Sequence, residues 1–225
     1  YINPAKAICL IACTLLLNSG CDDFLEEKDI PRITGDFYTT KQGIISAVDA
    51  TYSYMRFGVG GEYTNYFTEF GTDITTGADG GAAKHTNLYS PLSSGSQSFY
   101  PLWENHYKGI NVTNEVMQSL PNIDMTDLEK RTYSAEMHFF RGYFYFDLVQ
   151  QFGRIPLVTV AEKKVRTDFK RASVADIYNL IVSDLRHAEE NLRETPASQG
   201  QATVYAAAHL LAKVYLTRGS AVTDQ

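Results

Sequence analysis

The sequence of 225 residues predicts a mainly α-helical protein built from repeated helical hairpins. Apolar residues recur every three or four positions over most of the chain from residue 41 onward, which is the period of a helix packed on one face. Ser or Thr stands directly before three of these stretches, where a helix begins. Hydrophobic residues make up 44% of the chain, so it can bury a sizeable core.

Charge and cysteine content exclude several classes of protein. The net charge is -6, from 20 Lys+Arg against 26 Asp+Glu, so there is no electrostatic reason to bind nucleic acid or an anionic membrane surface. The three cysteines, Cys9, Cys13 and Cys21, all lie near the N-terminus. The rest of the chain therefore has neither a disulfide framework nor a CxxC metal site.

Residues 1–20 have the features of a secretory signal peptide. Lys6 precedes AICLIACTLLL, an apolar run that is too short for a membrane span of about 20 residues but fits the apolar core of a signal. Ser19 and Gly20 before Cys21 resemble the bacterial lipoprotein box, although Asn18 stands where an apolar residue is usual. We therefore expect Cys21 to carry lipid. The alternative is an ordinary signal peptide with a chance cysteine.

Residues 21–40 are predicted to be the lipidated N-terminus and a tether, and residues 41–225 a helical domain. Four carboxylates after Cys21 suit a solvated tether, since they cannot enter a bilayer. The first helix is expected in TTKQGIISAVDATYSYMRFG, where Ile44, Val48 and Met55 share a face. Residues 62–98 are rich in Gly, Ser, Thr, Asn and Asp without a sustained period, which predicts a long irregular loop.

Two helices are predicted between Phe99 and Phe152. In the first, Trp103 and Tyr107 lie at helical spacing, and Trp103 is expected in the core. Thr126 and Glu129 have the spacing of a capping box, which predicts that the second helix begins at Asp127.

The second helix carries Gly142 in its interior. Glycine there costs about 1 kcal/mol relative to alanine, so close contact with a second helix is expected.

The last two helices are predicted to begin after Ser173 and after Thr203, separated by the turn PASQGQAT. The helix pairs 99–152 and 173–218 are similar at an offset of 71 residues, as in the Ala-x-x-His motifs that end at His138 and His209. A repeated helical hairpin of this kind is typical of tetratricopeptide arrays, whose unit is about 34 residues. The larger offset is attributed to longer helices and an inserted segment, 153–172. Equivalent repeat positions favour a structural role for both histidines.

Six segments follow one another in a recognisable order: CDDFLEEK, EFGTDITTG, LWENHYKGINVTNEV, AEMHFFRGYFYFDLVQQFGRIPLV, RASVADIYNLIVSDLRHAEENL and QATVYAAAHLLAKVYL. In this order they resemble SusD/RagB-family lipoproteins of Bacteroidetes, and the run from Arg141 to Pro156 is the most specific part. Because members of that family are longer, this chain resembles an N-terminal portion. The resemblance implies a mainly α, tetratricopeptide-like fold with a long irregular loop.

The resemblance also implies a function: capture of a glycan or another nutrient by a lipid-anchored, surface-exposed protein of the outer membrane. The implied partner is a TonB-dependent, SusC-like transporter. An alternative is a helical-repeat scaffold that binds peptide or protein. A glycoside hydrolase, using carboxylates such as Glu69 and Asp73, is a further alternative. The chain has no GxSxG or HExxH motif and its five histidines lack ligand spacing, so we expect a binding protein without enzymatic activity, cofactor or metal.

The ligand is expected at the loop 72–98, because loops longer than about 12–15 residues are usually functional or disordered. Tyr89 offers an aromatic face, and Asp79, Lys84 and Asn87 offer hydrogen-bonding groups around it. By resemblance, this region in sugar-binding relatives supplies an aromatic platform and polar contacts. The alternative is a disordered Gly/Ser loop.

The last helix is expected to end near Gly219 without a polar capping repeat. Leu211, Val214 and Tyr215 are therefore predicted to lack cover, which would make the isolated chain prone to aggregation.

Overall fold

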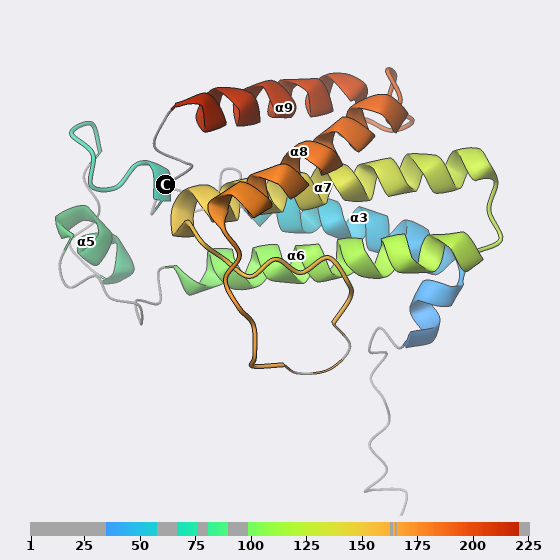
Figure 1. The fold of residues 1–225 in the computed structure, drawn as a ribbon, viewed down its shortest axis with the longest axis horizontal. Helices are drawn as coiled ribbons and strands as arrows, with labels where there is room; N and C mark the ends of the chain where they lie inside the picture. The colour runs from blue at the N-terminus through green and yellow to red at the C-terminus, as the bar shows by residue number, and fades with distance from the viewer. Residues whose placement is uncertain are drawn as a thin grey trace, which may run out of the picture. The chain divides into compact units, whose positions relative to one another are not determined.

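Figure 1 shows the computed structural model, which describes residues 35–57, 67–75, 81–89, 99–162, 164 and 166–220. The predicted signal peptide and Cys21 lie outside these residues, as does most of the tether. The described elements are η1 (Gly35–Thr39), α3 (Lys41–Phe57), α5 (Gly81–Leu88), α6 (Tyr100–Ser119), η2 (Leu120–Asn122), α7 (Asp127–Phe152), α8 (Val174–Asn191) and α9 (Val204–Gly219). The predicted mainly α-helical fold is confirmed.

Three helices begin at the residues that the sequence predicts. Before α7, the Thr126 hydroxyl accepts a hydrogen bond from the Glu129 backbone N–H (3.2 Å), and the Glu129 carboxylate accepts one from the Thr126 N–H (3.0 Å), which completes a capping box. The Ser173 and Thr203 hydroxyls cap α8 and α9 by accepting from backbone N–H groups three residues on. These side chains satisfy N–H groups that have no partner inside their own helix.

Four long helices form the two predicted hairpins, α6 with α7 and α8 with α9, and α8 packs on α7 (Figure 1). α3 packs against α6 and α7. The core follows α7, where four apolar side chains at intervals of three or four residues are fully buried: Met137, Phe140, Phe144 and Leu148. A helix that is buried on more than one side suits its place between two neighbours.

Close helix contact explains the glycines of α6 and α7. A Cβ atom built on Gly142 would lie 3.0 Å from the Leu185 side chain of α8, which confirms the predicted close approach. A Cβ on Gly109 of α6 would lie 2.6 Å from the Phe144 ring of α7, too near for any real contact. The two glycines thus allow α7 to approach both α6 and α8.

Part of the predicted irregular loop is wrong, because Gly81–Leu88 forms the helix α5. Ala82, Ala83 and Lys84 are good helix formers. With two turns and no apolar stripe, however, the segment carries no periodic signal.

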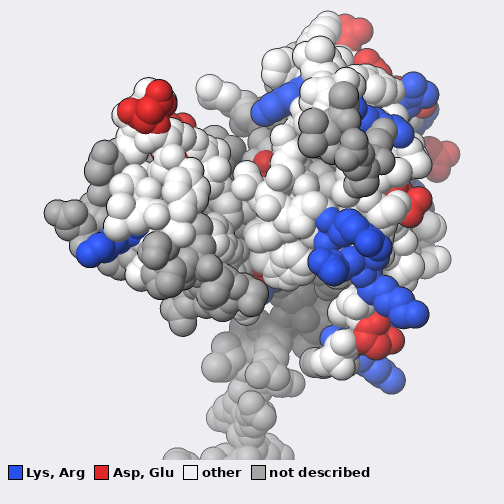
Figure 2. Space-filling view, turned by 60° about the vertical axis from the view of Figure 1, so that its left-hand side comes forward, with Lys and Arg blue, Asp and Glu red and all other residues white. Residues whose placement is uncertain are grey.

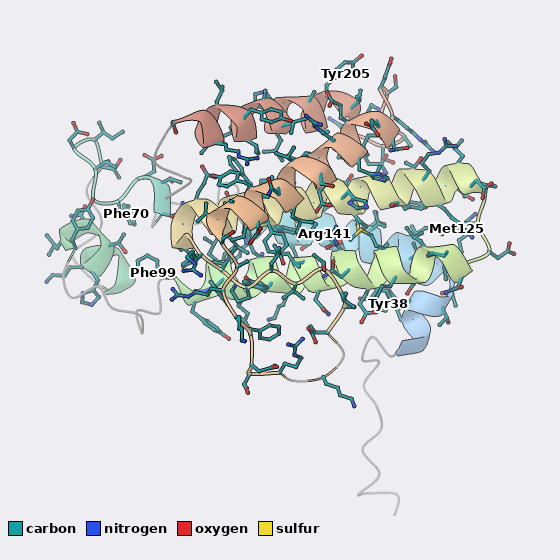
Figure 3. All side chains as sticks on the ribbon, in the orientation of Figure 1. Tyr38, Phe70, Phe99, Met125, Arg141 and Tyr205 are labelled. Carbon is teal, nitrogen blue, oxygen red and sulfur yellow. The ribbon has the colours of Figure 1, made fainter. Side chains whose placement is uncertain are left out.

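The predicted exposure of α9 is also partly wrong. Leu211 and Val214 are buried, because α9 packs mainly against α8 and also touches α7. The exposed side chains are on the other face, where Tyr205 points away from α8 (Figure 3) and Leu216 is 77% exposed. His209 is exposed as well, unlike His138, so the two equivalent positions do not share one structural role. Among the described helices, none is long and apolar enough to cross a membrane.

Candidate functional site

A buried polar network joins α6, α7 and α8, with Arg141 at its centre (Figure 3). The Arg141 guanidinium donates to both carboxylate oxygens of Asp184, at 2.7 and 2.8 Å, and to the Asn114 side-chain oxygen at 2.9 Å. His138 lies 2.7 Å from the same carboxylate. Burial alone would raise the pKa of Asp184, but the hydrogen bonds from Arg141 and His138 outweigh it and hold the pKa below its ordinary value.

The chain that follows α7 is fastened to the helices by side chains. The Tyr107 hydroxyl donates to the Pro156 carbonyl (2.7 Å), and the Asn114 amide donates to the Val158 carbonyl (3.0 Å). The Tyr145 hydroxyl donates to the same Val158 carbonyl (2.9 Å) and accepts from the Val158 N–H (2.7 Å). Because Asn114 also meets Arg141, the buried network and this fastening form one continuous structure.

Two further contacts fix the path of the inserted segment 153–172. The Asn111 side-chain oxygen accepts a hydrogen bond from the Glu162 N–H at 2.8 Å. Pro156 and Arg171 form an isolated antiparallel bridge, so the segment returns alongside its own beginning before α8 starts. The described residues of the segment therefore form a wall beside α6.

Between this wall and α6 lies a cavity of about 290 Å³, which we call the aromatic groove. Its lining is mostly apolar: Trp103, Tyr107, Ile110, Asn111, Pro156, Val158, Glu162 and Phe169. Trp103 and Tyr107, whose ring centroids are 4.8 Å apart, also line a wider hollow of about 640 Å³ that includes Tyr54 and Tyr100. Trp103 packs edge-on against Phe152 and is half-buried. The prediction that Trp103 lies in the core is therefore correct only in part, because the side chain also lines the groove.

The sequence-predicted ligand residues lie elsewhere. Lys84 and Asn87 are on α5 and Tyr89 follows it directly, whereas Asp79 lies outside the described residues. The Tyr89 hydroxyl donates to the Gly71 carbonyl (2.7 Å), and the Asn87 side-chain oxygen accepts from the Gly71 N–H (3.4 Å). Tyr89 is still 68% exposed. The structure therefore brings the side chains of Asn87 and Tyr89 together at the Gly71 backbone. The exposed ring of Tyr89 is held there through its hydroxyl group.

Left-handed backbone supports this contact. Gly71 has φ +82°, and a Cβ atom there would lie 2.7 Å from the Tyr89 hydroxyl oxygen. Tyr89 itself has φ 52°, which is uncommon for a residue with a side chain. Both positions suit a ring that lies closely over the Gly71 backbone.

Local sequence patterns do not reveal the aromatic groove, because its two walls are about 50 residues apart, as Tyr107 and Pro156 are. A signal for it does exist: Asn111 and Asn114 interrupt the apolar face of α6, and both side chains bind the inserted segment. Among the described residues, no group of three His, Cys, Asp or Glu side chains could hold a metal ion.

Comparisons with known proteins agree with one another. A family model described as starch-binding and associating with the outer membrane matches residues 38–216. A SusD-like protein from Formosa agariphila is 26% identical, covering 91% of this chain and 42% of that protein. A SusD-like protein from Bacteroides ovatus is 24% identical, covering 93% of this chain and 39% of that protein. This chain thus spans less than half the length of these relatives.

Solved structures show the same fold. A laminarin-binding SusD-like protein has a TM-score of 0.71 and 25% identity, covering 81% of this chain and 41% of its own. A SusD superfamily protein from Parabacteroides distasonis has a TM-score of 0.67 and 26% identity, covering 80% of this chain and 40% of its own. Since the family model covers most of the sequence, this chain belongs to the SusD-like family, described as starch-binding and associating with the outer membrane.

Proposed function

We propose that this protein captures a glycan at the cell surface and delivers it to a TonB-dependent, SusC-like transporter. Cys21, which follows the predicted signal peptide, anchors it to the outer membrane through lipid. Membership of the family and the laminarin-binding relative support carbohydrate as the ligand. In this role the protein binds the glycan and does not hydrolyse it.

The observation that carries the proposal is that the Tyr89 ring is exposed and at the same time held by a hydrogen bond. Its ring is open to solvent over most of its surface, yet its hydroxyl is bound to the Gly71 carbonyl. The face of an aromatic ring attracts the C–H side of a sugar, because the face is the negative end of the ring quadrupole. A ring that is already fixed loses little conformational entropy on binding. Lys84, exposed on α5, and Asp79 supply polar contacts in this proposal.

Calorimetry of the full-length protein with laminarin, the ligand of the relative, tests this site. Tyr89→Ala is expected to weaken binding about tenfold, the equivalent of about 1.4 kcal/mol. Tyr205→Ala is the matched control, because Tyr205 is 65% exposed on α9 and lies far along the chain. Unchanged affinity in Tyr89→Ala, at an unchanged melting temperature, would remove α5 from the site.

Two separate experiments test the remaining parts of the proposal. Labelled palmitate is expected to enter the wild type but not Cys21→Ala, and equal labelling would contradict lipidation. Release of reducing ends from laminarin, abolished by Glu69→Gln, would contradict the assignment as a binder.

A further inference from the structure

The inserted segment carries several positive charges that form no ion pair with the part of the chain that the structure describes. Lys and Arg side chains gather at the lower right of Figure 2. Arg166 is balanced, since it pairs with Glu162 (2.6 Å) and with Asp168 (2.9 Å). Four other cations of the segment take part in no ion pair among the described residues: Arg154, Lys164, Lys170 and Arg171. This local excess of positive charge is opposite in sign to the net charge of the protein, -6.

Two of these cations stand beside the aromatic groove. Arg171 pairs with Pro156, a residue of the groove wall, in the antiparallel bridge. Lys170 lies between Arg171 and Phe169, which is another residue of the wall. Both cationic side chains are exposed. We call Lys170 and Arg171 the cationic rim.

Phe169 is held in place although it is exposed. The Arg166 guanidinium carbon lies 4.7 Å from the centre of the Phe169 ring, a cation–π contact. Arg166 is in turn fixed by its two carboxylates. Arg166 therefore positions Phe169 in the groove wall. Its two carboxylate partners pair with Arg166 and not with Lys170 or Arg171, so the charges of the rim are available to a ligand.

The groove has the size and lining of a small-molecule site. Its volume of about 290 Å³ is just below the range of ligand pockets, which run from about 300 to 1,000 Å³. The rings of Trp103, Tyr107 and Phe169 offer aromatic faces, and the Asn111 side-chain amide offers hydrogen-bond donors beside them.

We infer that the aromatic groove is a second carbohydrate site, and that Lys170 and Arg171 make it selective for acidic sugars that carry a carboxylate or a sulfate. Aromatic walls take the ring of the sugar, while the rim binds the acidic group. A guanidinium suits this role because its planar fork donates two parallel hydrogen bonds to a carboxylate or sulfate. The inference rests on the proposed function of carbohydrate capture and adds a ligand class and a place distinct from Tyr89.

The test compares tri-galacturonate with the same trisaccharide in its methyl-esterified, neutral form, using calorimetry of the full-length protein. We expect the acid to bind at least about tenfold more tightly than the ester at low salt, and the difference to shrink as salt screens the charges. The double variant Lys170→Gln/Arg171→Gln is expected to abolish the preference, whereas Lys213→Gln, which removes an exposed charge of α9, leaves it unchanged. Trp103→Ala is expected to weaken the binding of both forms.

Three results would overturn the inference. The first is equal affinity for acid and ester in the wild type, and the second is a preference that survives in the double variant. The third is binding to vesicles of phosphatidylcholine and phosphatidylglycerol (7:3) that the double variant abolishes, without any preference for the acid; the rim would then be a membrane contact. If laminarin still binds in any of these cases, the proposed function stands and only the inference about the groove fails. If the protein binds no saccharide at all, both the inference and the proposed function are overturned.

Discussion

Replacing Arg141 with methionine removes the cation that neutralises Asp184 in the middle of the helical domain. Arg141 donates two hydrogen bonds to Asp184 and one to Asn114, and the Asp184 side chain is only 2% exposed. Removing one partner of a buried ion pair costs about 3–5 kcal/mol, because the other charge stays buried. For a domain of this size, each kcal/mol lowers the melting temperature by about 2–4 °C, so we expect a decrease of about 6–20 °C.

Urea denaturation at pH 7, followed by circular dichroism, measures this loss directly. The matched control replaces the pair together, as Arg141→Met/Asp184→Leu, and is expected to be more stable than the single variant because it leaves no unpaired charge. A single variant within about 1 kcal/mol of the wild type would refute the reasoning. A double variant that is no more stable than the single one would refute it as well.

The same pair gives a prediction about acid. The folded state lowers the pKa of Asp184, so its contribution to stability is complete above its unfolded value of about 3.9 and is lost as the pH falls through the lower folded value. In Arg141→Met, the hydrogen bonds from Arg141 are absent and the pKa of Asp184 rises, although His138 remains beside it. A higher folded pKa reduces the stability that the folded state loses when Asp184 is protonated. The difference in free energy of unfolding between wild type and variant, measured by urea denaturation at pH 7 and at about pH 4, is therefore expected to narrow as the pH falls.

Three other predictions follow from single contacts. Gly142→Ala places a methyl group 3.0 Å from Leu185 and is expected to cost about 1–3 kcal/mol by thermal melting, although alanine favours a helix; an equal or higher melting temperature would contradict this. The hydrogen bond from Lys41 is the main cause of the low pKa of Glu129, about 2, so Lys41→Met should move it toward 4.5 in an NMR titration. Leu216→Glu should reduce any concentration-dependent association of the 225-residue chain in sedimentation experiments, since Leu216 is exposed on α9; a chain that is monomeric without the substitution would show that this face is not adhesive.

The helical hairpins could be predicted because their signals are local. Thr126, three residues before Glu129, marks the start of α7 whatever packs around it, and the apolar period carries the helix to Phe152. The helix α5 could not be predicted in this way, because a two-turn helix without an apolar stripe has no period to detect. Tertiary contact with Gly71 now gives Asn87 and Tyr89 their positions.

The aromatic groove could not be predicted from local sequence patterns, for a different reason. Trp103 and Phe169 acquire a common cavity only when the inserted segment returns along α6, and that path depends on hydrogen bonds between residues about 50 positions apart, as with Tyr107 and Pro156. The sequence does contain Arg141 and Asp184, but nothing in it indicates that they are partners. Helix periodicity predicts which face is buried and leaves open which polar groups meet there.

The inserted segment is bound to the helices through hydrogen bonds to its main chain. Tyr107, Asn114 and Tyr145 bind the backbone of Pro156 and Val158, and Asn111 binds the backbone N–H of Glu162. No side chain of the segment takes part in these four attachments, although Ile155 of the segment is fully buried in the core. Substitution of exposed residues of the segment can therefore change what it presents without removing these hydrogen bonds. Such substitutions can alter the wall of the aromatic groove, while α6 and α7 keep the scaffold constant.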